Sequence, residues 1–319
     1  MRIKITRPFQ IGCFSLVVLC AVVDMVYFAI VPKAKFLPAG SGIPSGEIIF
    51  HPLTLSDPNK YSDQLIGFIH PDGSGLETRS YQIAQSLFFD KSPVKYYAQT
   101  PSQIFTWGLD GTSIGGIYAT GDTVYYGYPV VVHADGRISY CDPDKSIIAE
   151  GYILVISENE IMAIQAGYLD DKTRLVIYDM DRCQITKILY TPQEDEDLGG
   201  FSYTEAHWLA LGISSNNVVN FRIYDPNMNF VNEIKDVRSA VFSRDSLEIA
   251  YIDNYGNICI MGRVSFKPTC RGTAGYTLSW SPDSKWLVYS NENGNLIKQN
   301  IETGEETIIG KGFFPDWKP

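Results

Sequence analysis

Several features are scarce in this 319-residue chain, and each scarcity excludes a class of protein. No long stretch after residue 35 repeats its apolar residues every 3.6 positions, which excludes a helical bundle. Runs of Lys and Arg are missing as well. The first 35 residues hold five basic residues and one acid, so the remainder has 21 basic and 35 acidic residues and a formal net charge of −14. Such a body repels phosphate backbones, and we expect no nucleic-acid partner.

Cysteine is sparse too, and its spacing excludes a zinc site. Four of the six cysteines lie beyond the N-terminal stretch, at Cys141, Cys183, Cys259 and Cys270, and no two are separated by the two to four residues that zinc ligands need. We therefore expect no metal and no cofactor. An even number in an exported body favours disulfides. Cys259 and Cys270 flank one hairpin-length segment and are the candidate pair; Cys141 with Cys183, or four small buried side chains, are the alternatives.

The N-terminal region has the composition of a membrane anchor. Ile11 to Val31 is apolar except for Asp24, and its 21 residues are enough to span a bilayer core. Asp24 costs about 2.5 to 3.5 kcal/mol near a helix centre, whereas the twelve Ile, Leu, Val and Phe residues of the stretch return about 4 to 7 kcal/mol. We therefore expect an uncleaved transmembrane signal anchor at residues 11–31, after a cytoplasmic basic end at residues 1–10.

Flanking charges predict the orientation of this anchor. Basic groups before it, with the amino terminus, slightly outnumber Lys33 and Lys35 after it, so the body is expected outside the cytoplasm, on the periplasmic or extracellular side of a single-pass protein. A cleaved signal peptide is the alternative, because Ile11 to Val23 has the length of an apolar signal region. Residues 32–45, which include a segment rich in Gly, Pro and Ser, form a predicted tether.

The strongest pattern in the chain is an internal repeat. Six residues recur 38 positions later: Ser243, Asp245, Ser246, Tyr251, Gly256 and Asn257 return as Ser281, Asp283, Ser284, Tyr289, Gly294 and Asn295. Strand-forming runs separate these turn residues, and a period near forty residues is typical of one propeller blade. Residues 46–319 are therefore expected to form an all-β, six- or seven-bladed β-propeller after the transmembrane helix.

The last residues restart the repeat. Trp317 stands 37 positions after Trp280, so Phe314 to Pro319 would supply one strand of a further blade. A blade completed by strands from the two ends of the propeller leaves no free sheet edge. We expect the ring to close in this way. Upstream, Pro71 to Gly75 and the Asp-Gly pair at Asp110 mark outer hairpins.

Trp280-Ser281-Pro282-Asp283-Ser284, followed by Trp286-Leu287-Val288-Tyr289, resembles the repeat of the TolB-like propellers, a bacterial WD40-like (PD40-type) family. Phe242 to Ser246 is similar to the same repeat. In this chain Ser246 and Ser284 stand where the family has Gly. The resemblance implies a propeller fold and, from TolB itself, a periplasmic protein that recruits partners. It implies no single reaction.

Candidate catalytic motifs lack the context that their chemistry needs. Gly111 to Gly115 matches a G-x-S-x-G nucleophile motif, but the residues after it have a strand pattern, so we expect a hairpin turn around Ser113. His133 precedes a turn, and the acidic run Glu194 to Asp197 lacks the spacing of a calcium loop. The catalytic residues are unknown. Trp107 is the candidate exposed binding aromatic, whereas Trp280 and Trp317 are expected between blades.

These features predict a membrane-anchored, extracytoplasmic β-propeller that acts as a protein-binding or scaffolding module without catalysis. A protein partner would dock on a propeller face or at the channel mouth, and the membrane would be reached through Ile11 to Val31. A propeller-fold carbohydrate hydrolase or lyase is one alternative, recognisable by two carboxylates about 5 to 10 Å apart in a deep cleft. A glycan or small-ligand binder without catalysis is the other, recognisable by a rim of exposed aromatics.

Overall fold

A computed structural model describes residues 47–53, 66–79, 105–119, 126–135, 137–141, 147–166, 173–216, 218–273 and 277–319. All of these belong to one compact unit, Ala39–Pro319. The predicted anchor at Ile11 to Val31 and the predicted tether lie outside the described residues. Within the described part of the chain, no helix is long and apolar enough to cross a membrane.

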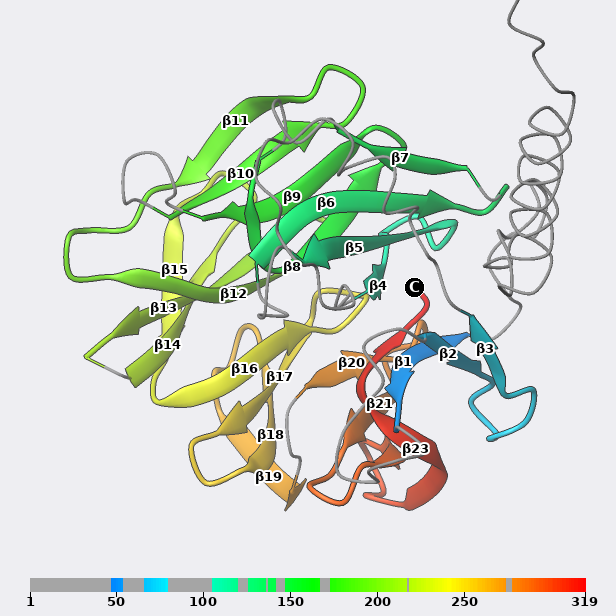
Figure 1. Cartoon of the computed structure of the whole chain (residues 1–319). Coiled ribbons are helices and arrows are strands. Elements are labelled where there is room, and N and C mark those ends of the chain that lie inside the picture. The colour runs from blue at the N-terminus through cyan, green and yellow to red at the C-terminus, as the bar shows by residue number, and fades with distance from the viewer. Residues whose placement is uncertain are drawn as a thin grey trace, which may run out of the picture. The chain divides into compact units, whose positions relative to one another are not determined.

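The described residues form 23 strands, which confirms the all-β body (Figure 1). The first eleven strands are β1 Ile48–Pro52, β2 Ile66–Ile69, β3 Glu77–Arg79, β4 Phe105–Trp107, β5 Ser113–Ala119, β6 Tyr126–His133, β7 Ile138–Tyr140, β8 Ala149–Ser157, β9 Glu160–Gln165, β10 Arg174–Asp179 and β11 Gln184–Tyr190. The others are β12 Asp197–Tyr203, β13 Leu209–Ser215, β14 Val218–Tyr224, β15 Phe230–Ile234, β16 Val237–Phe242, β17 Glu248–Asp253, β18 Asn257–Gly262, β19 Pro268–Thr273, β20 Leu278–Trp280, β21 Trp286–Ser290, β22 Asn295–Asn300 and β23 Glu306–Trp317.

These strands pair into four antiparallel sheets. Two sheets have four strands in sequence order, β12 to β15 and β16 to β19. The eight-stranded sheet runs β11-β10-β9-β8-β6-β5-β4, with β7 also paired to β6, and β6 and β8 meet only at Tyr126 and Gly127. The seven-stranded sheet runs β20-β21-β22-β23-β1-β2-β3. Each of the larger sheets therefore contains two groups of up-and-down strands.

Strand β23 joins the C-terminal and N-terminal parts of this unit. Its first half pairs with β22, whereas its second half pairs with β1, with Trp317 opposite Ile48 and Asp316 opposite Ile49. Figure 1 shows this red strand beside the blue strand β1. The pairing confirms the expectation that strands from the two parts complete one blade. As a result, β1 has a hydrogen-bonded partner strand on both sides, whereas a strand at the edge of an open sheet has a partner on one side only.

The first strand of each group contacts the first strand of the next. The contacts run in the order β4, β8, β12, β16, β20 and β23, and then return from β23 to β4. The sheets are thus arranged as a propeller-like ring. Val176-Ile177-Tyr178-Asp179 and Arg222-Ile223-Tyr224-Asp225 fall on equivalent third strands, as their matching sequences indicate. Asp197, the last residue of the acidic run Glu194 to Asp197, begins β12.

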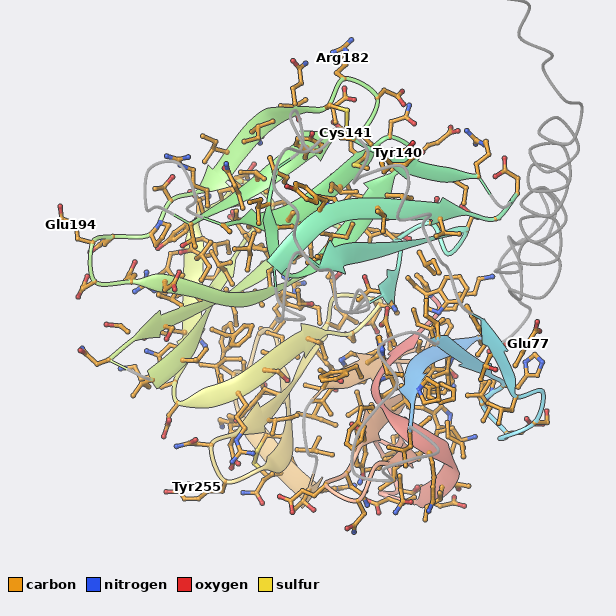
Figure 2. The ribbon with its side chains drawn as sticks, in the orientation of Figure 1. Glu77, Tyr140, Cys141, Arg182, Glu194 and Tyr255 are labelled. Atoms are coloured by element: carbon orange, nitrogen blue, oxygen red, sulfur yellow. A yellow bond between two sulfur atoms is a disulfide. The ribbon has the colours of Figure 1, made fainter. Side chains whose placement is uncertain are left out.

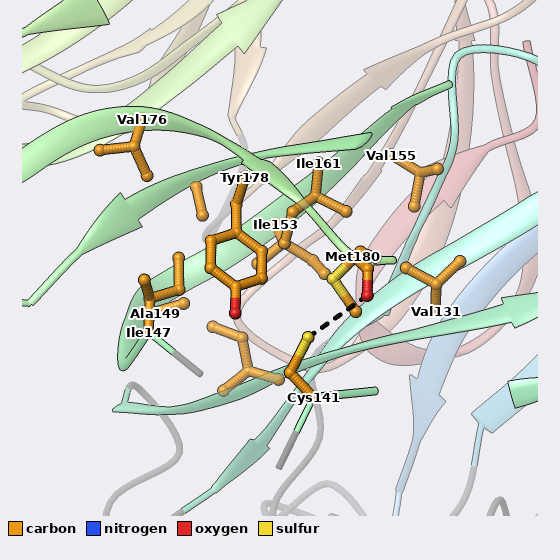
Figure 3. Close-up of a cluster of buried hydrophobic side chains, with 12 residues drawn as sticks. Val131, Cys141, Ile147, Ala149, Ile153, Val155, Ile161, Val176, Tyr178 and Met180 are labelled. Carbon is orange, nitrogen blue, oxygen red and sulfur yellow. Dashed lines mark hydrogen bonds between the residues drawn. The ribbon is translucent and has the colours of Figure 1, made fainter. Parts of the chain in front are cut away.

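Apolar side chains from neighbouring groups of strands pack together and hold the ring. Figure 3 shows one such layer, in which Val131 of β6, Ile153 and Val155 of β8 and Tyr178 of β10 form a buried cluster. Trp280 and Trp317 are 1% and 3% exposed, which confirms their predicted place in the core. Removing a buried aromatic side chain of this size typically costs about 3 to 5 kcal/mol.

The repeated Ser and Asp residues build the turns that follow the inner strands. After β16, Ser243 Oγ donates to Asp245 Oδ1 at 2.6 Å, and the same carboxylate oxygen accepts the N–H of Leu247 at 3.0 Å. Ser281, Asp283 and Lys285 repeat this arrangement after β20. Each Asp therefore caps a turn N–H group that has no ladder partner.

One residue in each turn must adopt a left-handed backbone conformation. Ser246 has φ 60° and Ser284 has φ 55°, and Gly111 occupies the corresponding turn after β4 with φ 63°. A side chain raises the energy of this conformation by about 1 to 2 kcal/mol, which explains why glycine is usual at the position. The two serines are therefore locally strained.

Ser246→Gly is expected to raise the free energy of unfolding by about 0.5 to 1 kcal/mol. Glycine relieves the backbone strain of the folded state, and this gain exceeds the free-energy cost of the extra conformational entropy that glycine gives the unfolded chain. Ser284→Gly is the matched control. Ser284 Oγ accepts the N–H of Asp245 at 3.2 Å, so its removal sacrifices a hydrogen bond and the net gain should vanish. Urea unfolding followed by tryptophan fluorescence measures both changes. A destabilised Ser246→Gly variant would show that strain is not the dominant effect.

Candidate partner-binding face

Side-chain hydrogen bonds link neighbouring inner strands around the centre of the ring. Small polar residues next to the inner aromatic positions make most of them. The bonds are Thr106 Oγ1 to Ile153 O (2.7 Å), Phe242 N to Ser202 Oγ (3.0 Å), Trp317 N to Ser279 Oγ (2.9 Å), Trp107 N to Asp316 Oδ2 (2.7 Å) and Trp280 Nε1 to Val241 O (3.2 Å). These bonds give partners to backbone N–H and C=O groups of the inner strands. Such groups face the centre of the ring, where there is no neighbouring strand to pair with them.

Among the residues that make these hydrogen bonds, Asp316 is the one with a carboxyl group. Its carboxylate accepts the N–H of Trp107 at 2.7 Å and the hydroxyl of Ser279 at 2.7 Å, so it joins β23 to both β4 and β20. Protein atoms surround the carboxyl closely, and this desolvation raises its pKa despite the opposing effects of Arg244 and the two hydrogen bonds. Asp316 is thus already engaged in closing the ring.

Arg244 follows β16 and reaches toward the same region. Its Nη2 donates to the carbonyl oxygen of Trp317 at 2.6 Å, while its Nε is buried and has no hydrogen-bond partner. Desolvation lowers the pKa of Arg244, and the charges of Asp316 and Glu205 act in the opposite direction. The centre of the ring therefore contains one cation whose hydrogen-bonding capacity is incompletely used.

A separate apolar surface lies where the turn after β16 meets the loop between β18 and β19. We call Trp208, Leu247, Arg263 and Val264 the docking patch. Leu247 and Val264 are 57% and 86% exposed, and the guanidinium carbon of Arg263 lies 3.8 Å from the ring centroid of Trp208. Arg263 also donates from Nε to Ser246 O at 2.6 Å and from its backbone to Leu247 O at 2.8 Å. These bonds hold the patch in one arrangement.

An ionic cluster connects the two sheets that contain β11 and β14. Arg222 pairs with Glu196 and Glu233 and donates to the hydroxyl of Tyr190 at 3.0 Å. Desolvation works against ionisation of Glu196, but hydrogen bonds from Arg222 and Gln193 outweigh it and lower the pKa of the carboxyl. Burial, followed by nearby charges, raises the pKa of Tyr190 to about 12. Glu196 belongs to the acidic run Glu194 to Asp197, so this part of the run has a structural role.

Arg222→Ala is expected to lower the free energy of unfolding by about 2 kcal/mol, because Glu196 would remain poorly hydrated without its cation. The exposed pair Arg137 and Asp135 provides the control, since solvent screens this pair and Arg137→Ala should cost much less stability than Arg222→Ala. A lowered pKa in the folded state stabilises the protein above the ordinary value of 4.5, and this stability is lost as the pH falls below it. Chemical unfolding at several pH values should therefore show the Arg222 effect shrink in acid. An effect equal to that of Arg137→Ala would contradict the prediction.

The structure corrects the expectation for Trp107. This side chain is 2% exposed, because β4 is an inner strand and places the ring at the centre, with Lys318 Nζ 5.1 Å from its centroid. Trp107 therefore offers no exposed aromatic surface. Among the described residues, the large exposed aromatics are Tyr255 and Phe230, at 86% and 60% exposure, and Figure 2 shows Tyr255 projecting from the turn after β17.

The four cysteines outside the N-terminal stretch lie in two pairs. Cys259 and Cys270 are bonded and stand opposite each other on β18 and β19. Cys141 and Cys183, the less favoured of the two bridges considered from the sequence, are also bonded, at a sequence separation of 42. One bridge thus closes a hairpin, whereas the other links β7 to the turn between β10 and β11.

The other singled-out residues have structural contacts. Ser113 is 2% exposed and begins β5 after a hairpin turn, which confirms the expected turn, and its hydroxyl donates to Asp110 at 3.2 Å. His133 Nε2 lies 2.8 Å from Ser139 Oγ. Glu194 projects outward (Figure 2), and within the described ranges no group of three or more His, Cys, Asp or Glu side chains could hold a metal ion.

In comparisons with known proteins, this chain is similar to solved structures, whereas the sequence comparisons find no match. No family profile matches it, and no curated protein matches its sequence. A chain of a mitotic checkpoint complex is 14% identical over 68% of this chain and 69% of its own length, with a TM-score of 0.43. PorZ, an essential surface component of the type-IX secretion system of Porphyromonas gingivalis, is 11% identical over 83% of this chain but 33% of its own, with a TM-score of 0.45. Hydrazine synthase of Kuenenia stuttgartiensis is 12% identical over 67% of this chain and 80% of its own, with a TM-score of 0.42.

Proposed function

We propose that this chain is a membrane-anchored, extracytoplasmic β-propeller of the TolB-like type, with six blades, that binds a protein partner through the docking patch. The cycle of six inner strands supports the blade number. The apolar N-terminal stretch Ile11 to Val31 and its flanking charges support the anchor and the export of residues 46–319, with residues 32–45 as tether.

The observation that carries the binding role is the composition of the docking patch. A propeller-like ring fits a protein-binding scaffold, and Trp and Arg are the residues most often found at the energetic centre of protein interfaces. Here Trp208 and Arg263 are stacked and flanked by the exposed apolar side chains of Leu247 and Val264. Burial of these side chains by a partner would recover hydrophobic free energy that the isolated chain leaves unused.

An enzymatic role needs carboxylates that are free to act as acid and base. Asp316 lies at the centre of the ring, but its two oxygens already accept hydrogen bonds from Ser279 and Trp107. At the centre of the ring, a hydrolase or lyase would therefore have to use a carboxylate that holds strands together, whereas the binding role uses exposed residues.

Crosslinking from the docking patch tests this proposal. A photoreactive residue at Val264 should capture one defined protein in intact cells, and Leu247→Asp should abolish that crosslink. Tyr255→Asp is the matched control, because Leu247 precedes β17 and Tyr255 follows it, so the two exposed residues lie at opposite ends of one strand. Capture that is equally strong in all three proteins would reject the docking patch. Alkaline carbonate extraction of the membranes separately tests the anchor.

A further inference from the structure

The docking patch offers a partner a cation that is held on an aromatic ring. The indole ring of Trp208 lies against Phe242, with the two ring centroids 6.4 Å apart, and packs against the buried cluster that includes Met261. The guanidinium carbon of Arg263 lies 3.8 Å from the centroid of the same indole. Because Arg263 already occupies a face of the ring, a partner at this patch meets the guanidinium first.

This guanidinium has more hydrogen-bond donors than the described residues use. N–H groups are present on Nε and on both Nη atoms of an arginine. In Arg263, Nε donates to Ser246 O at 2.6 Å, whereas neither Nη has a hydrogen bond or an ion pair to any described residue. Glu205, exposed in the turn before Trp208, makes no such pair either. The stacking and the bond from Nε fix the plane of the group, so the two Nη atoms keep one orientation.

The acidic residues next to Arg263 along the sheet are directed elsewhere. The N–H of Arg263 donates to Leu247 O at 2.8 Å, and Gly262 stands opposite Glu248. Successive side chains of a strand point to opposite faces, so Arg263 shares a face with Leu247, whereas Glu248 lies on the other face, toward β20 to β22. The carboxylate of Asp245 is engaged by the N–H of Leu247. Within the described part of the chain, the charge of Arg263 is therefore not neutralised by an ion pair.

Two exposed aliphatic side chains flank this cation. Leu247 is joined to Arg263 by the backbone hydrogen bond, and Val264 is the next residue in the chain. A partner that covers both must therefore bring apolar groups close to the group that bonds to Arg263. Nucleic acids and lipid headgroups bring many charges, which the net charge of −14 beyond residue 35 repels. A single carboxylate beside apolar side chains meets less repulsion and gains short-range hydrogen bonds.

We infer that the docking patch recognises a peptide segment in which an acidic residue stands next to an aliphatic one. The carboxylate of the segment accepts parallel hydrogen bonds from the two Nη atoms of Arg263, a geometry that suits guanidinium and carboxylate groups. The aliphatic neighbour covers Leu247 or Val264 and removes their apolar surface from water. This inference rests on the proposed protein-binding role and adds the chemistry by which the partner is chosen.

Selection of short random peptides on the full-length chain in detergent tests the inference. Leu247→Ser identifies the peptides that bind the docking patch, because it removes an apolar contact without adding a charge and should weaken them about tenfold. We expect these peptides to contain Asp or Glu beside Leu, Ile or Val. Patch-binding peptides without an acidic residue would overturn this inference and leave the docking patch as a binding site. A selection with no peptide sensitive to Leu247→Ser would reject the docking patch itself, and the inference with it.

A double-mutant cycle on one selected peptide assigns its carboxylate to Arg263. Replacing the acidic residue of the peptide by its amide should weaken binding to the parent chain about tenfold, because charge-assisted hydrogen bonds are lost. The same replacement should not change binding to Arg263→Gln. Arg238→Gln is the matched control, since Arg238 is an exposed arginine of the same sheet that donates to the carbonyl oxygen of Asn254 at 2.7 Å. This control should keep the tenfold effect.

Near-ultraviolet circular dichroism shows whether each variant is folded. If Arg263→Gln is not, Arg263→Lys decides, because it keeps the charge but lacks the planar fork and should reduce the tenfold effect. An undiminished effect in the folded Arg263 variant would contradict the assignment of the carboxylate to this residue.

Discussion

A chain shortened after Lys311 is expected to lose the cooperative unfolding transition of the ring. The deletion removes the second half of β23, so β1 loses the ladder partners that now stand opposite Ile48 and Ile49. It also removes the buried ring of Trp317 and the carboxylate of Asp316, which links β23 to β4 and β20. Loss of a core aromatic alone costs about 3 to 5 kcal/mol, a large part of the total stability of a typical domain.

Urea unfolding, followed by circular dichroism and tryptophan fluorescence, measures this effect. The matched control ends at Trp317 and lacks only the last two residues. It should lose about 1 to 2 kcal/mol, from the bond between Lys318 N and Glu47 O and from the position of the Lys318 ammonium over Trp107. If the shorter chain unfolded in one transition with the stability of this control, the ring would not depend on β23 for its closure.

Replacing both Cys141 and Cys183 by alanine is expected to lower the free energy of unfolding by about 4 kcal/mol, because the bridge closes a 42-residue segment and restricts the unfolded chain. The pair Cys259 and Cys270 has a sequence separation of 11, so its replacement should cost about 3 kcal/mol. The order of the two effects follows from loop length, whereas their absolute size depends on how compact the unfolded chain is.

Guanidinium unfolding of the two double variants measures these differences, after mass spectrometry without reductant has established both bridges in the parent chain. Adding reductant to the parent should reproduce the combined loss. The alanine variants should be insensitive to reductant at the replaced pair. Equal stability of parent and Cys141→Ala/Cys183→Ala would show that this bridge does not restrict the unfolded chain as its length predicts.

Much of the fold could be predicted because local sequence determines the repeated turns. Asp245 and Asp283 cap N–H groups within three residues of themselves, so their contacts follow from the sequence. The closure by Trp317 was predictable for a similar reason, since the repeat itself places an inner strand there. The start of β12 at Asp197 was not, because Asp and paired glycines favour a loop and only pairing with β13 makes them a strand.

The candidate sites were less predictable, because each combines residues from different blades. Trp107 looked exposed beside an Asp-Gly turn, but its burial depends on Lys318 and Asp316 at the other end of the chain. Arg222 meets Glu196 across two sheets. Sequence separation says nothing about such distances.

The division of β23 between two sheets also bears on how the chain is made. On the ribosome, β1 is synthesised long before its ring-closing partner β23, so β1 must wait with one edge open until β23 has been made. Long-range pairing of this kind is slow, and an open strand edge is prone to aggregation. A chaperone that covers β1 until β23 has been synthesised would therefore protect this protein at the stage when it is most vulnerable.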